Sequence, residues 1–73
     1  MKTAEQLGKI LAEMYNDAPR NEQVTGIHLF GIKYAEEIKN AGIKSVIDFS
    51  GIKSTYRTEV SKGVNLAKYV VVK

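Results

Sequence analysis

Apolar residues that recur every three or four positions constrain the fold of this chain more than any other feature. The first such repeat consists of Leu7, Ile10, Leu11 and Met14. Before it, Thr3 and a glutamine three residues later have the spacing of an N-terminal capping box. The pattern predicts an amphipathic helix over residues 4–16. Asparagine, aspartate and proline in residues 16–21 favour a turn and end the helix.

A second repeat occupies residues 22–41 and predicts one long helix over residues 23–40, ended by Gly42. Gly26 and Gly31 lie inside it and each weakens a helix by about 1 kcal/mol relative to alanine. We interpret both as points of close packing against a neighbouring helix. Leu29 and Ile32 lie off the main stripe, which indicates burial on more than one side, either centrally in the fold or at a subunit contact. We favour the central position. The main stripe consists of Val24, Ile27, Phe30, Tyr34, Ile38 and Ala41.

The size of the chain allows a single core. With 73 residues and no cysteine, neither disulfides nor a thiolate metal site supplement that core. Glu5 and Glu13 interrupt the N-terminal apolar stretch, which argues against a signal peptide. No apolar run approaches the about 18 residues of a membrane span. We therefore expect one domain over residues 1–73 with no membrane partner, and the lack of cysteine fits a cytoplasmic protein.

The C-terminal part predicts two further helices and a tail. Ser45 is placed to cap a short helix over 46–50, and Ser54 to cap a longer one over 55–69. The β-branched residues 70–72, followed by Lys73, prefer an extended conformation. Such a tail is compatible with packing on the monomer, with a wing, or with pairing to a second copy. We expect an all-α domain of four helices with a C-terminal helix-turn-helix and a short extended tail.

Residues 43–63 supply the parts that a helix-turn-helix needs. Val46, Ile47 and Phe49 are the apolar residues of its first helix. Gly51 lies in the turn, where the lack of a Cβ permits a left-handed conformation, and Ile52 follows as an apolar plug. The second helix has an apolar inner stripe, consisting of Tyr56, Val60, Val64 and Ala67.

The opposite face of the second helix carries hydrogen-bond donors and cations, the groups that read base edges and bind phosphates. An ordinary solvated face is the alternative. We favour DNA because this face holds one acid, Glu59, and several short hydroxyl side chains that are poor helix formers. The predicted DNA-binding residues are Lys53, Ser54, Thr55, Arg57, Thr58, Ser61, Lys62, Asn65 and Lys68.

The positive charge of the chain is concentrated in the same segment. Residues 42–73 hold six basic side chains against Asp48 and Glu59, a net charge of +4, whereas residues 1–41 have five basic and six acidic side chains, a net charge of −1. A field of that sign favours an anionic partner such as nucleic acid.

The segment GIKSTYRTEVSKG, residues 51–63, resembles the turn and recognition helix of the lambda-repressor-like (Xre-type) helix-turn-helix proteins, and the whole resemblance covers about residues 43–63. The resemblance implies sequence-specific binding of double-stranded DNA by a helix at about 54–65, in a transcriptional regulator that acts as a dimer. Ile47 and Arg57 depart from the pattern, which usually has a small alanine and a buried aliphatic there; Arg57 is expected to face outward. The whole chain also resembles small bacterial proteins described only as helix-turn-helix-like. The matching positions are Gly51, Ile52, Tyr56, Thr58, Val60, Lys62 and Gly63.

We do not expect an enzyme, a metal or a cofactor. His28, the single histidine, stands beside Leu29 in an apolar segment, where a packed or surface role is the usual one. Glu36 and Glu37 are adjacent on a helix and point about 100° apart, which is too divergent for a carboxylate pair. No phosphate-binding loop is present. The alternative to DNA binding is a protein-interaction or assembly module that uses the same fold, because fold does not fix function.

Overall fold

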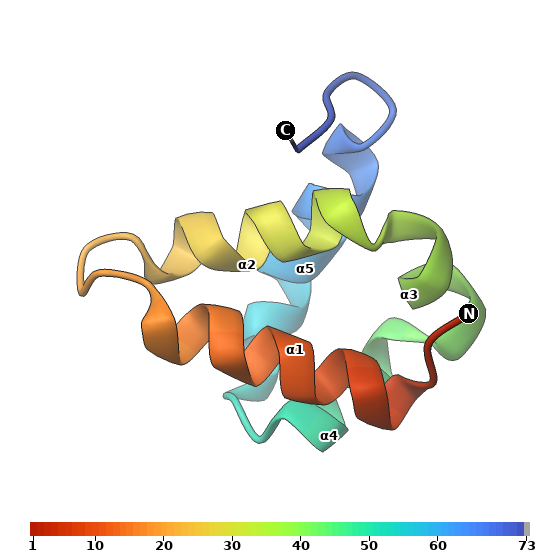
Figure 1. The fold of residues 1–73 in the computed structure, drawn as a ribbon, viewed down its shortest axis with the longest axis horizontal. Coiled ribbons are helices and arrows are strands. Elements are labelled where there is room, and N and C mark those ends of the chain that lie inside the picture. Colours follow the sequence, from red (N-terminus) through yellow and green to blue (C-terminus); the bar gives the residue numbers. More distant parts are fainter. Residues whose placement is uncertain (73) are drawn as a thin grey trace.

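The computed structural model describes residues 1–72, and every regular element in that range is helical (Figure 1). The expected all-α class is therefore confirmed, with five α-helices in the described range in place of the expected four. The elements are α1 (Ala4–Asp17), α2 (Gln23–Lys33), α3 (Ala35–Ala41), α4 (Ile43–Ser50), a 3-10 helical turn η1 (Ser54–Tyr56), and α5 (Arg57–Leu66).

Helix α1 begins at the predicted capping box. The backbone N–H of Gln6 donates to Thr3 Oγ1 at 3.2 Å, and the backbone N–H of Thr3 donates to Gln6 Oε1 at 2.9 Å. Two N–H groups that the helix cannot satisfy internally thereby find acceptors. The helix ends at Asp17, one residue beyond the predicted end.

The predicted single helix over residues 23–40 is wrong, because the chain breaks at Tyr34. That residue has φ −113° and ψ 24° and separates α2 from α3. Its ring packs on Phe30 with 5.5 Å between ring centroids, and the ammonium groups of Lys2 and Lys33 lie 5.4 and 5.5 Å from its centre. These contacts hold the ring in place, and α3 turns away to pack against α4 and α5.

A single glycine makes the connection from α3 to α4, so α4 begins earlier than predicted. Gly42 has φ +93°, which lets the chain reverse within one residue. Helix α4 starts directly afterwards at Ile43, so Ser45 lies exposed inside its first turn and is not a cap. Lys44 lies in this helix for the same reason.

The last helix is shorter than predicted. It is preceded by the 3-10 segment η1, and the residues at the N-terminal ends of η1 and α5 are Lys53 and Tyr56, so Ser54 is not the predicted cap. Helix α5 ends at Leu66, residues 67–69 form a turn, and the backbone N–H of Val70 donates to the carbonyl oxygen of Leu66 at 3.1 Å. Residues 70–72 belong to no helix or strand, which agrees with a short tail after the last helix, and Lys73 lies outside the described residues.

The core is built from one face of each helix. Within α5 the predicted inner stripe is confirmed: Val60 and Val64 are buried, and Tyr56 and Ala67 pack at the edge of the core. Burying an aliphatic or aromatic side chain of this kind stabilises the fold by about 1.5–3 kcal/mol. The fully buried large side chains are Leu7, Leu11, Ile27, Phe30, Ile38, Val46 and Val60.

Three apolar residues that the sequence suggested were interior lie at the surface. Val24 and Leu29 of α2 are 43% and 40% exposed, so the expected burial is wrong at these two positions, whereas Ile32 is half-buried. Phe49 of α4 is 56% exposed. Its Cβ lies over Gly8 of α1.

Glycines set the two closest helix crossings. A Cβ added to Gly31 of α2 would lie 2.6 Å from the Val60 carbonyl oxygen and 2.9 Å from Gly63 Cα on α5. A Cβ added to Gly8 of α1 would lie 2.6 Å from Phe49 Cβ on α4. The interpretation of Gly31 as a close-packing position is therefore confirmed. Gly26 also packs closely, since its Cβ would lie 3.2 Å from the Met14 carbonyl oxygen.

We predict that Gly31→Ala destabilises the protein. The added methyl group would meet backbone atoms, which cannot rotate away, and overpacking of this kind costs about 1–3 kcal/mol. A Cβ at 2.6 Å from a backbone oxygen places this cost at the upper end of the range, about 2–3 kcal/mol. The higher helix propensity of alanine offsets about 1 kcal/mol of it, leaving a net loss of about 1–2 kcal/mol in the free energy of unfolding. Urea denaturation measures the loss, with Thr25→Ala at an exposed position of α2 as the control. Equal midpoints for Gly31→Ala and the wild type would contradict the crossing.

Candidate nucleic-acid interface

The turn between α4 and α5 has the conformation that the sequence predicts. Gly51 is left-handed with φ +76°. Ser50 closes the turn, since its hydroxyl donates to the Ile47 carbonyl oxygen at 2.6 Å and accepts from the Ile52 N–H at 3.2 Å. Ile52 packs against the core as the expected plug. The turn therefore fixes where α5 begins and which of its faces points outward.

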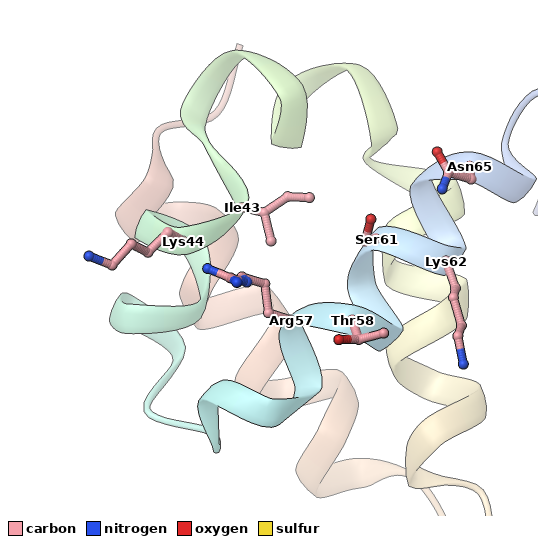
Figure 2. Close-up of a pocket in the computed structure, with 7 residues that line it drawn as sticks. All are labelled: Ile43, Lys44, Arg57, Thr58, Ser61, Lys62 and Asn65. Atoms are coloured by element: carbon pink, nitrogen blue, oxygen red, sulfur yellow. The ribbon is translucent and has the colours of Figure 1, made fainter.

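The outward face of α5 borders an open groove against the first turn of α4 (Figure 2). Five of the nine predicted DNA-binding residues meet there. Lys44 of α4 and Arg57 of α5 lie on the side of the groove next to α4. Lys62 of α5 lies on the opposite side, towards α2. The result is a groove with polar donors along α5 and a cation on each side. Its lining consists of Ile43, Lys44, Arg57, Thr58, Ser61, Lys62 and Asn65.

The other four predicted residues lie outside this groove. Ser54 shares a smaller adjacent hollow with Arg57 and Asp48. Lys53 and Thr55 are exposed in the turn and in η1, before α5 begins. Lys68 is exposed in the turn that follows α5. These residues extend the polar surface at both ends of the helix.

Lys44 and Ile43 line the groove although neither was predicted there. The predicted start of the first helix at residue 46 left both outside that helix, although they lay within the predicted helix-turn-helix segment, residues 43–63. A signal was nevertheless present, since Gly42 directly before them permits a one-residue reversal and an immediate helix start. Lys44 contributed to the +4 charge of residues 42–73 without being assigned a position.

The packing accounts for both departures from the lambda-repressor-like pattern. Ile47 is buried at 3% exposure where a small residue is usual. Helix α4 packs mainly on α1, and α5 packs mainly on α2. Because the closest contacts of α4 and α5 are with these other helices, the space between α4 and α5 has room for a large side chain. Arg57, the first residue of α5, is exposed as expected.

The one acid of α5 is held by two neighbours. Glu59 Oε1 lies 2.7 Å from His28 Nε2 on α2, and its Oε2 lies 3.3 Å from Lys62 Nζ. The hydrogen bond to His28, followed by the contact with Lys62, holds the pKa of Glu59 below its ordinary value. His28 is a partly buried hydrogen-bonding residue between two helices.

Residues 1–72 contain neither a cluster of metal ligands nor a membrane-spanning helix. No three histidine, aspartate or glutamate side chains in that range gather closely enough to hold a metal ion. No helix there has both the length and the apolar character to cross a membrane.

We predict that Glu59→Gln lowers stability at neutral pH more than at acidic pH. Because the folded-state pKa of Glu59 is lowered, its contribution is present above the unfolded pKa and is lost as the pH falls through the folded value. Thermal melts should show a larger difference in melting temperature between the wild type and the variant at about pH 7 than at about pH 3. The control is Glu36→Gln, since that side chain is 81% exposed. A difference that is the same at both pH values would contradict the assignment.

The comparison with known proteins agrees with this architecture. No curated protein and no solved structure matches the chain. A family model described as an HTH-like domain matches residues 3–73, nearly the whole chain. The protein therefore belongs to the HTH-like domain family, a helix-turn-helix type of domain.

Proposed function

We propose that the protein binds double-stranded DNA sequence-specifically, with α5 in the major groove, and acts as a transcriptional regulator. The observation that carries the proposal is the groove between α4 and α5, where short polar donors stand between cations. Membership of a helix-turn-helix family supports it, as does the lambda-repressor-like pattern of residues 51–63. A single α-helix is about 10–12 Å wide with its side chains and fits the major groove, which is about 12 Å wide.

The side chains divide into two roles. Lys44, Arg57 and Lys62 flank the outward face of α5 and suit contacts with phosphates, which position a protein on the duplex. Thr58 and Asn65 line the groove between them and suit base edges, asparagine being able to form two hydrogen bonds with adenine. The exposed Lys53 and Lys68 extend the positive surface before and after α5.

We predict duplex binding that weakens steeply with added salt, because binding to phosphates releases condensed counterions. Lys44→Ala, Arg57→Ala and Lys62→Ala should each reduce affinity and flatten the slope of log K against log salt by about one unit. Fluorescence anisotropy with a labelled duplex measures both quantities. Lys9→Ala is the control, because it removes an exposed charge from α1, outside the groove. It should change the affinity and the salt slope less than the three groove variants do.

No duplex binding by the wild type at low salt would overturn the DNA proposal. It would favour the alternative, a protein-interaction or assembly module. The exposed apolar side chains near the C-terminus are the observation that favours this second function, since Leu66 is 43% exposed and Val71 is 78% exposed.

We also propose that the protein acts as a dimer. One small helix-turn-helix contacts few base pairs, and pairing two copies on adjacent half-sites raises specificity. The C-terminal segment offers apolar surface for such a contact, with Tyr69 82% exposed and Val70 46% exposed. Leu29 of α2, 40% exposed, is the second candidate.

We predict that removing the residues after Tyr69 converts a dimer to a monomer. Sedimentation velocity of the intact and truncated chains at high micromolar concentration measures the change. Phe49→Ala on α4 removes another exposed apolar side chain and should leave the dimer intact. A monomeric intact chain would contradict the dimer, whereas a dimer that survives truncation would move the contact to Leu29 and Ile32.

A further inference from the structure

Glu59 stands out on the groove-facing helix because it is the one acidic side chain in α5. Its side chain is 22% exposed and lies between two more exposed side chains, those of His28 (30% exposed) and Lys62 (60% exposed). Each carboxylate oxygen has its own partner, with Oε1 at 2.7 Å from His28 Nε2 and Oε2 at 3.3 Å from Lys62 Nζ. The acid is thus shared between a neighbouring helix and a cation that lines the groove.

The bond to His28 keeps the carboxylate on the α2 side of α5. Helices α2 and α5 meet at Gly31 and Gly63 with their backbones in contact, which fixes the backbone of His28 relative to α5. With one oxygen held in this way, Glu59 is poorly placed to extend into the groove and accept a hydrogen bond from a base. It remains a negative charge beside Lys62.

We infer that Glu59 restrains Lys62 and thereby limits sequence-independent binding to phosphates, with His28 as its positioning residue. This inference rests on the proposed DNA binding. A phosphate that approaches Lys62 must compete with the Glu59 carboxylate for the same ammonium group and is repelled by its charge. Phosphate contacts carry no sequence information. When the contact between Lys62 and phosphate is weakened, a larger share of the binding free energy comes from the polar side chains that suit base edges.

The exposure of the pair explains why its effect should appear in binding. Ion pairs at the surface stabilise a fold little, since water and salt screen them. Because the Lys62 side chain is 60% exposed, its ammonium group can exchange a carboxylate for a phosphate with little structural change. The same exchange changes the number of phosphates that the protein neutralises, which sets the salt dependence of binding.

The test is Glu59→Gln, which removes the charge and keeps an oxygen that can accept a hydrogen bond from His28. Anisotropy titrations with random-sequence duplexes across a salt series should show an affinity gain of about two- to fivefold. The slope of log K against log salt should steepen by up to about one unit. Adding Lys62→Ala to the variant should abolish the gain, because the effect acts through that ammonium group.

Two further variants serve as controls. Glu36→Gln makes the same change of charge in another acid–lysine pair, at 4.0 Å from Lys39 Nζ and outside the groove lining, and should give a smaller gain. Glu59→Ala also removes the charge and introduces a residue with a higher helix propensity, so it should reproduce the gain in affinity. Circular dichroism melts establish that each variant is folded at the temperature of the titration.

The outcomes separate the inference from the proposed function. Wild-type binding with equal gains for Glu59→Gln and Glu36→Gln would overturn the inference and leave DNA binding in place. A loss of affinity confined to duplexes with cytosine at one position would also overturn it, because Glu59 would then read a base. Absence of duplex binding by the wild type and all variants would overturn both.

Discussion

The close approach of α2 and α5 is the contact on which the rest of the structure depends. Gly31 and Gly63 face each other without side chains, and a Cβ on either would meet the backbone of the opposite helix. This crossing buries Val60 and Val64 and so determines that the polar face of α5 points outward. It also brings His28 within 2.7 Å of Glu59. One backbone contact thus sets the core, the outward face and its internal charge pair.

A second glycine crossing holds the other half of the helix-turn-helix. Gly8 lets α1 approach α4 at Phe49, so α4 is fixed by α1 and α5 by α2. The two helices are therefore positioned from outside and not by close packing on each other. Space for Ile47 and an open groove lined by Lys44 and Arg57 both follow from this arrangement.

The charges of the groove depend on the same geometry. Lys44 and Arg57 come from different helices and meet because Gly42 starts α4 at once and Gly51 reverses the chain after it. On the far flank, Glu59 is held by a residue of α2 and contacts Lys62. The proposed nucleic-acid surface therefore has two cations, Lys44 and Arg57, on one side and Lys62, which contacts Glu59, on the other.

The sequence by itself determined the features that act within one helical turn. The capping box of Thr3, the left-handed turn at Gly51 and the buried stripe of α5 are local signals, and each agrees with the structure. The interpretation of Gly31 also held, because a glycine inside a helix is costly without a close neighbour.

Only the tertiary structure decided where α2 ends, where α4 begins and which residues share the groove. The break at Tyr34 depends on a ring held by Phe30 and by two lysines, one of them 32 residues away along the chain. Apolar periodicity continues through the break and so gives no sign of it. Lys44 joins Arg57 through the placement of α4 on α1, a contact between segments distant in sequence. Local pattern fixes the faces of a helix, whereas the crossings between helices fix which faces meet.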